Sequence, residues 1–286
     1  MSWPLCRQPG IRPGPSLTFG LPPVTFVFPL LLRRCLAEFI GTAFLLAIVI
    51  GSGIMATNMT DNVALQLLCN TTATAAGLVA LILALGPVSG AHFNPVVTIA
   101  DRVFGGMKNR ELLPYFAAQV SGAIVGVIIA NLMFSLPAIE ASTKVRDGGG
   151  IWLGEIVATL GLLLVIFGVV RSGRSTAAPF AVAGYIAAAY FFTSSTSFAN
   201  PAVTIARSLS DTFAGIAPES VLGFIAMQLV GMVLAIGVIW VLFPTIGEVA
   251  DEILLRHNDI TNTDSPHTDS PHTDSPHTDS PEGTSR

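Results

Sequence analysis

Three ionisable side chains stand out within the apolar part of the chain: Glu38, Glu155 and His92. Catalysis requires acids, bases, nucleophiles or metal ligands that converge on one reacting group. The two carboxylates lie in separate apolar runs, and His92 is the only histidine outside the C-terminal tail. The cysteines show no paired spacing that would indicate a metal site or a disulfide framework. The sequence therefore argues against an enzyme and predicts neither a metal site nor a cofactor.

A second pattern repeats across the chain: NPVVTIA occurs at residues 94–100 and NPAVTIA at residues 200–206. Asparagine is a strong helix N-cap, and proline suits the first helical position because its missing N–H would be unpaired there. Each copy therefore predicts the start of a short helix, whose asparagine amide can donate a hydrogen bond to a polar solute. Such an arrangement suits a small neutral molecule that bears oxygens. The motif residues are Asn94, Pro95 and Val96 in the first copy and Asn200, Pro201 and Ala202 in the second.

The composition indicates a membrane protein. The 286 residues are 51% hydrophobic and 11% charged, whereas soluble domains usually carry about a quarter charged residues. The charges fall mainly between apolar runs, each near the roughly 20 residues that a helix needs to cross a bilayer. We expect an all-α protein embedded in the lipid bilayer, and the lack of a basic patch makes nucleic acid an unexpected partner. The predicted spans are residues 35–55, 65–86, 112–134, 151–170, 177–193 and 221–243.

The two motifs begin two further apolar segments that are too short to cross, predicted as half-helices at residues 94–102 and 200–209. LAEFIGT opens the first span and LGEIVAT the fourth, so the chain has two matching halves of three spans each. An odd number of spans inverts the second half, and the half-helices then enter from opposite faces and meet near the midplane. Their positive dipole ends disfavour cations at the centre.

Charge and composition set the remaining boundaries. Six spans place both termini on one side, and the short segments on that side hold most of the lysines and arginines, which predicts cytoplasmic termini. We expect a channel domain at residues 31–249. A Pro-rich extension at residues 1–30 and a tail at residues 250–286, with TDSPH repeats, are both predicted to be disordered, because neither can bury a core.

The sequence resembles the aquaporin, or major intrinsic protein, family over residues 34–246. The resemblance rests on AEFIGT, SGAHFNPVVT, SFANPAVT and the inverted repeat. It implies six transmembrane helices with two re-entrant half-helices, one pore for small neutral solutes in each subunit, and a homotetramer. The pattern ANPAVTIARSLSDTFAGIAP is similar to bacterial aquaglyceroporin-like channels, some of which accompany arsenic-resistance genes. It implies a bacterial inner-membrane protein and makes undissociated arsenite and methylated arsenicals candidate solutes.

The resemblance also indicates a wide outer constriction. Most family members resemble NPAR at the second motif, and the arginine there lines and narrows the pore, whereas this chain has Val203. Spacing from the two asparagines places the other constriction positions at Thr74, Ala188 and Ser197. All four side chains are small or short and none is charged, so we expect passage of solutes larger than water.

Two other polar residues leave alternatives open. Arg207 lies one helical turn beyond Val203 and either lines the vestibule, partly replacing the missing arginine, or sits at the outer mouth, beside Asp211 or near the helix C-terminus, where cations are favoured. His92, two residues before Asn94, is either a hydrogen-bonded wall residue or a pH-sensitive gate.

The intramembrane carboxylates Glu38 and Glu155 separate two classes of function. They either accept hydrogen bonds from the loops before the half-helices or couple protons to solute movement in a secondary transporter. A channel equilibrates its solute, whereas a coupled transporter accumulates it. A third hypothesis, a non-conducting structural membrane protein, predicts no solute flux.

Overall fold

The computed structural model describes residues 30–244, and every regular element in this range is helical. This confirms the prediction of an all-α fold. The predictions for the extension, apart from Leu30, and for the tail at residues 250–286 lie outside the described residues. Six of the described helices are long and apolar enough to cross a membrane. They are α1 (Leu30–Met59), α2 (Val63–Ser89), α4 (Asn109–Met133), α5 (Gly149–Arg171), α6 (Ala178–Phe192) with the short helix η1 (Ser175–Ala177) before it, and α8 (Pro218–Leu242).

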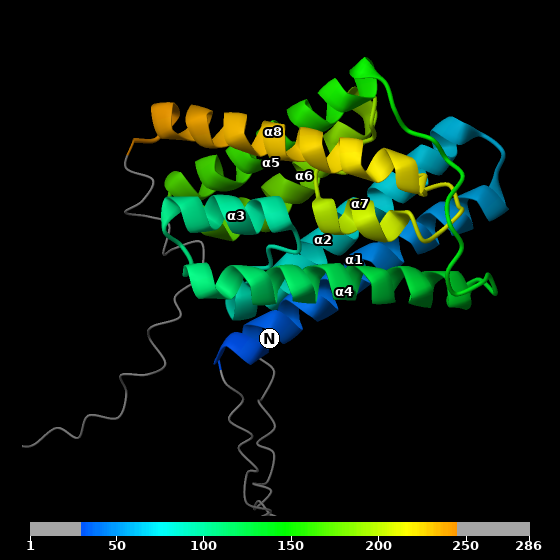
Figure 1. Ribbon diagram of the computed structural model, residues 1–286, viewed down its shortest axis with the longest axis horizontal. Helices are drawn as coiled ribbons and strands as arrows, with labels where there is room; N and C mark the ends of the chain where they lie inside the picture. Colours follow the sequence, from blue (N-terminus) through cyan, green and yellow to red (C-terminus); the bar gives the residue numbers. More distant parts are fainter. Residues whose placement is uncertain (1–29, 245–286) are drawn as a thin grey trace, which may run out of the picture.

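Two short helices lie in the interior between the long ones. Helix α3 (Pro95–Phe104) and helix α7 (Pro201–Arg207) are 10 and 7 residues long, and both begin at the proline of an Asn-Pro motif. Figure 1 shows them end to end, with their N-terminal ends facing each other. Both helices contact α4 and α8, one long helix from each half. The first residue of α1 and the last of α8 lie at the same end of the bundle (Figure 1), as six crossings require.

Glycines let the long helices approach closely within each half. A Cβ on Gly126 of α4 would lie 2.1 Å from the carbonyl oxygen of Ala43 in α1. A Cβ on Gly231 of α8 would lie 2.6 Å from the carbonyl oxygen of Ile156 in α5. Both distances are below any real contact, so only glycine fits, as is common where membrane helices pack. Each half therefore has one tight helix pair that fixes its frame.

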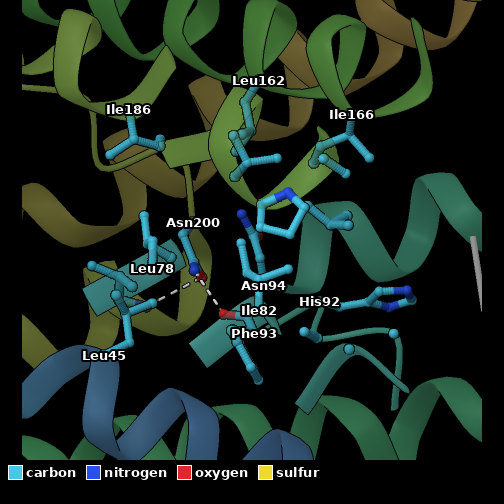
Figure 2. A pocket seen from close by; sticks show the side chains of 18 of the residues that line it. Leu45, Leu78, Ile82, His92, Phe93, Asn94, Leu162, Ile166, Ile186 and Asn200 are labelled. Atoms are coloured by element: carbon cyan, nitrogen blue, oxygen red, sulfur yellow. Dashed lines mark hydrogen bonds between the residues drawn. The ribbon is translucent and has the colours of Figure 1, made fainter. Parts of the chain in front are cut away.

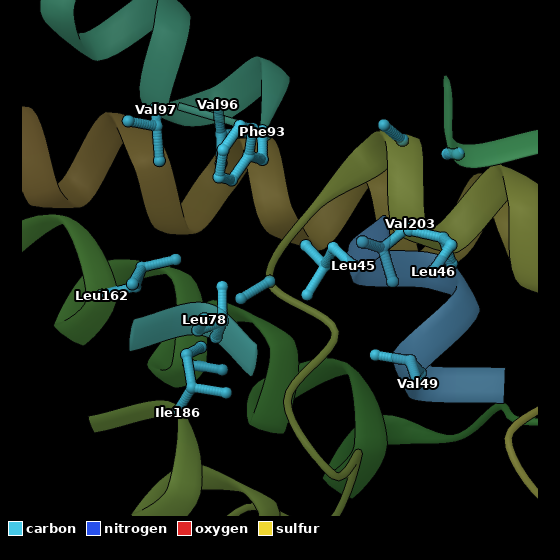
Figure 3. Close-up of a cluster of buried hydrophobic side chains, with 14 of the residues drawn as sticks. Leu45, Leu46, Val49, Leu78, Phe93, Val96, Val97, Leu162, Ile186 and Val203 are labelled. Carbon is cyan, nitrogen blue, oxygen red and sulfur yellow. The ribbon is translucent and has the colours of Figure 1, made fainter. Parts of the chain in front are cut away.

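Apolar residues occupy both the interior and the outer surface. Leu45, Leu78, Leu162 and other buried side chains from both halves pack together around the half-helices (Figure 3). Large apolar side chains are also exposed on the outside, including Leu222 at 78% and Val241 at 81%. Soluble proteins do not expose so many large apolar side chains, so this outer surface suits contact with lipid.

Candidate functional site

Asn94 and Asn200 cap the two half-helices. The Asn94 Oδ1 accepts a hydrogen bond from the backbone N–H of Val96 at 3.0 Å, and the Asn200 Oδ1 accepts one from Ala202 at 3.0 Å. Each cap pairs a backbone N–H that the first helical turn leaves without an intrahelical partner. Val96, which replaces alanine in the first motif, is fully buried and leaves the Asn94 cap in place.

The same two asparagines join the halves of the molecule. The Asn94 Nδ2 donates to the carbonyl oxygen of Ala199 at 2.8 Å, and the Asn200 Nδ2 donates to the carbonyl oxygen of Phe93 at 2.8 Å. Figure 2 shows the two side chains close together among the residues that line the cavity. An amide nitrogen carries two protons, so each side chain keeps one N–H for a solute.

The loops before the half-helices have an unusual backbone. Ala91 and Phe93 have φ values of 48–49°, and Ser197 and Ala199 have values of 52° and 48°. Left-handed conformations cost non-glycine residues about 1–2 kcal/mol each. The four positions correspond between halves, one and three residues before each asparagine. Such loops need strong hydrogen bonds to hold them.

Glu38 supplies these bonds in the first half. Its carboxylate accepts from the backbone N–H of His92 at 3.0 Å and of Phe93 at 2.7 Å. The Gln119 Nε2 donates to the same carboxylate at 2.8 Å and to the Thr98 hydroxyl at 3.0 Å. The network therefore connects α1, α4 and α3 to the loop.

Glu155 forms the matching network in the second half. Its carboxylate accepts from the backbone N–H of Phe198 and of Ala199, both at 2.9 Å. The Gln228 Nε2 donates to it at 2.7 Å and to the Thr204 hydroxyl at 2.9 Å. Both carboxylates are fully buried, and neither lines the cavity within residues 30–244. The geometry places them as supports of the loops rather than in the wall of the cavity.

A cavity of about 340 Å³ runs past both asparagines. It reaches from Pro179, near the start of α6, to Tyr190, near its end, and eleven helical residues span roughly 16 Å. Most of its wall is apolar. The lining includes Leu45, Val49, Leu78, Ile82, Val97, Leu162, Ile166, Val182 and Ile186.

The structure corrects one of the four constriction positions. Thr74, Ser197 and Val203 line the cavity. Ala188 is exposed on the outer side of α6 and does not line it, so its assignment was wrong. Tyr190 lines the cavity instead, and its hydroxyl donates to the Thr74 Oγ1 at 3.4 Å.

A signal for Tyr190 was present in the sequence. Val182, Ile186 and Tyr190 recur every fourth residue and all line the cavity, which is the spacing of one helix face. The prediction of Ala188 rested on its sequence separation from Asn200. An irregular loop lies between the two residues, so this separation does not determine which side of α6 faces the cavity.

Arg207 lines the cavity rather than pairing with Asp211. Its side chain is buried, its Nε donates to the carbonyl oxygen of Ala214, and its guanidinium carbon lies 3.4 Å from the centre of the Phe198 ring. Asp211 instead accepts from the N–H of Thr143 at 2.9 Å. Arg207 thus borders the cavity from the C-terminal end of α7, and the position beside Asp211 is not the one it adopts.

His92 lies in the other half of the cavity wall. Its Nδ1 is 3.2 Å from the Thr98 hydroxyl, and its Nε2 is 3.8 Å from an oxygen of Asp101. The ring also packs at 5.7 Å from the ring of Tyr115. Asp101 lines the cavity too, and sequence reasoning missed it, although it is the only carboxylate in the 94–102 segment.

A model of the family described as "Major intrinsic protein" matches residues 26–198. The chain belongs to the major intrinsic protein family. This family consists of multi-pass membrane channels, not enzymes, which agrees with the six apolar helices and the central cavity.

Individual relatives in the family extend over most of the channel domain. The chain is 50% identical to the aquaglyceroporin AqpS of Rhizobium meliloti (strain 1021) over 215 residues, which cover 75% of this chain and 92% of that protein. It is 33% identical to the aquaporin AqpM of Methanothermobacter thermautotrophicus over 183 residues, covering 54% and 71%. The X-ray structure of the aquaglyceroporin from Plasmodium falciparum aligns with a TM-score of 0.57 at 22% identity, covering 76% and 98%. This last match shows a shared fold.

Proposed function

We propose that this major intrinsic protein is a passive channel for small uncharged polar solutes, including water and glycerol-like polyols. One observation carries the proposal: Asn94 and Asn200 present their amides to a continuous cavity whose other walls are mainly apolar. Two hydrogen-bond donors on an apolar wall suit a molecule that carries oxygens and no charge.

Charged solutes fit this cavity poorly. An ion that leaves water loses a large hydration energy, and apolar walls return little of it. The facing N-terminal ends of α3 and α7 add positive potential near the two asparagines, which raises the barrier for cations. Neutral solutes avoid both costs.

The constriction residues support passage of solutes larger than water. Val203, Thr74 and Ser197 are short and uncharged where they line the cavity, although Tyr190 makes this region narrower than an alanine would. Undissociated arsenite resembles a small neutral polyol, and methylated arsenicals are of similar size, so both are candidate solutes. One similar protein carries the name aquaglyceroporin, which supports a polyol.

The bonding of the carboxylates argues against proton coupling. The Glu38 and Glu155 oxygens already accept backbone and glutamine hydrogen bonds, away from the cavity. A coupling site would need access to solute or water. We further propose that the channel lies in a bacterial inner membrane as a homotetramer with cytoplasmic termini, as the charge pattern and the family resemblance indicate.

Stopped-flow light scattering on proteoliposomes tests this function. Vesicles are mixed with sucrose, glycerol or arsenous acid, and protein-free vesicles of the same lipid serve as the control. In sucrose, we expect the vesicles to shrink rapidly and stay shrunken. In glycerol, we expect them to shrink rapidly and then re-swell much faster than the protein-free control. Folded protein that accelerates neither water nor glycerol would refute the channel and favour the structural alternative. Fast water flow without re-swelling would exclude the polyols.

A further inference from the structure

Three cationic side chains gather at the outer end of the cavity, on the face opposite the described chain ends. The Arg207 and Arg146 guanidinium carbons lie 3.4 Å and 5.2 Å from the centre of the Phe198 ring. The Lys144 Nζ donates to the carbonyl oxygen of Phe213 at 2.8 Å, and the Arg146 Nε donates to that of Gly215 at 2.9 Å. Neutral carbonyls and one aromatic face therefore hold the cluster in place.

No carboxylate forms an ion pair with this cluster within residues 30–244. Asp211, a nearby acid, is occupied by the backbone and hydroxyl of Thr143. Glu155 accepts from the Phe198 and Ala199 amides and offsets part of the charge of Arg146 and Arg207 without forming an ion pair with either. Three cations therefore face two carboxylates, Asp211 and Glu155, and the outer end of the cavity keeps a net positive charge.

Two polar side chains at this end have unused hydrogen-bonding capacity. In the described structure only the Nε of Arg207 has a hydrogen-bond partner, so its two terminal nitrogens remain available while the side chain lines the cavity. Ser197 also lines the cavity, and its hydroxyl is buried and has no partner among the described residues. Buried polar groups are normally satisfied. An oxygen of a solute in transit could accept from the terminal nitrogens of Arg207.

We propose that Arg207 is the specificity-determining residue of the outer pore: it excludes cations and donates hydrogen bonds to solute oxygens, with Ser197 as the second polar contact. This rests on the proposed channel function. Most family members carry a fixed positive charge at the position of Val203. In this chain the corresponding charge, that of Arg207, lies one helical turn farther out. The ring of Phe198 and the carbonyl of Ala214 fix its position.

The position of Arg207 follows from its helix. It is the last residue of α7, and helical side chains lean toward the N-terminus of their helix. A side chain at the end of α7 therefore reaches back toward the cavity. Val203, one turn nearer the asparagines, is too short to block its approach. Stacking on an aromatic face suits the planar guanidinium and would not suit a lysine equally well.

Guanidinium and urea provide a matched pair of permeants. They are nearly the same size and shape, but guanidinium carries a fixed positive charge and has no acceptor oxygen. Influx of each at low concentration into proteoliposomes gives a guanidinium-to-urea ratio for every variant. We expect wild-type protein to carry urea and largely exclude guanidinium. Arg207→Gln removes a unit charge that lies a few ångströms from the path of the solute. This change should raise the guanidinium-to-urea ratio at least about tenfold.

Two further variants keep the test decisive. Arg110→Gln removes an exposed arginine from the opposite end of the molecule and should leave both fluxes unchanged. Phe198→Leu removes the aromatic support of Arg207 and should raise the ratio in the same direction as Arg207→Gln, even if Arg207→Gln itself does not fold.

The outcomes separate this proposal from the channel function. The role of Arg207 would be overturned if the wild-type protein carried urea and guanidinium equally well. It would also be overturned if folded variants at Arg207 and Phe198 kept the wild-type ratio. Neither result would contradict the channel function. A wild-type protein that carries neither urea nor glycerol would refute the channel itself.

Discussion

In the proposed channel, the side chains at the outer end of the cavity are those expected to select the solutes that pass. Val203 contributes two methyl groups where a long cation would narrow the passage. Tyr190 contributes a ring, and its weak 3.4 Å bond to Thr74 lets its hydroxyl turn toward a solute. Arg207 supplies charge one turn farther out. Size selection and charge selection are thus carried by different residues.

Val203→Arg should reduce glycerol flux more than water flux. The new guanidinium would fill the passage beside Tyr190 and lie one turn from Arg207, where like charges destabilise a helix by about 0.2–0.5 kcal/mol. We expect glycerol re-swelling to slow at least about tenfold, which corresponds to about 1.4 kcal/mol of added barrier. Val203→Met, which adds length without charge, is the control. Equal loss of water and glycerol flux would indicate damage to folding instead.

A pair of substitutions on α6 tests the corrected constriction. Tyr190→Ala removes a ring from the cavity wall and should speed glycerol and admit a larger polyol such as erythritol. Ala188→Phe adds a ring on the exposed side and should leave every flux within about twofold, since surface changes usually have small effects. Both variants are measured by re-swelling rate. The assignment of Tyr190 fails if Ala188→Phe blocks flux and Tyr190→Ala does not.

The half-helices and their loops form the element on which the pore depends. Each asparagine caps its own helix and bonds the opposite loop, so the two tips are held against each other. Each buried glutamate then holds a loop whose backbone is strained. The chain repeats this design in both halves, with Gln119 and Gln228 in matching places.

Glu155→Gln should destabilise the fold. The amide would turn an N–H₂ group toward backbone donors, and each buried donor left unpaired costs about 1–3 kcal/mol. We expect the free energy of unfolding in detergent to fall by about 2–4 kcal/mol, measured by a denaturant titration. Glu219→Gln, an exposed change at the start of α8, should have little effect. A stable Glu155→Gln protein whose solute flux loses a dependence on proton gradient would favour coupled transport.

The loop between α4 and α5 should make cation exclusion depend on pH. Partial desolvation, and next the charges of Arg146 and Arg207, lower the pKa of Lys144 to about 8. Lys144 is therefore mainly charged below that pH and mainly neutral above it. Because this pKa lies below the unfolded value, the same group makes the fold more stable as pH rises through about 8.

We expect the wild-type guanidinium-to-urea ratio to rise about two- to threefold between about pH 7 and about pH 9 on the outer side, a modest change because solvent screens an exposed charge. Lys144→Gln should show the higher ratio at both values. A pH response that persists in Lys144→Gln would assign the titration to another group.

At the scale of the whole molecule, two helix pairs provide the rigid frame. Gly126→Ala would force a Cβ against the Ala43 carbonyl and separate α1 from α4. Overpacking of this kind typically costs about 1–3 kcal/mol. Gly237→Ala, in α8 with open space around it, should be neutral or stabilise the fold by about 0.5–1 kcal/mol. Thermal unfolding of both variants gives the comparison, and equal stability would contradict the close packing.

The sequence predicted the parts of this molecule that local chemistry determines. Asn94 and Asn200 cap helices because of their own side chains, and the spans follow from apolar length. The partner of Arg207 could not be predicted, because stacking on Phe198 depends on a loop conformation with left-handed residues. Ala188 was misplaced for the same reason, since its direction depends on the rotation of α6.

The most direct test of the central claim is glycerol equilibration into proteoliposomes under an imposed proton gradient. A passive channel predicts fast influx that stops at equal concentrations inside and outside, whatever the direction of the gradient. Accumulation of glycerol above the external concentration would contradict the account and indicate that the protein couples protons to transport.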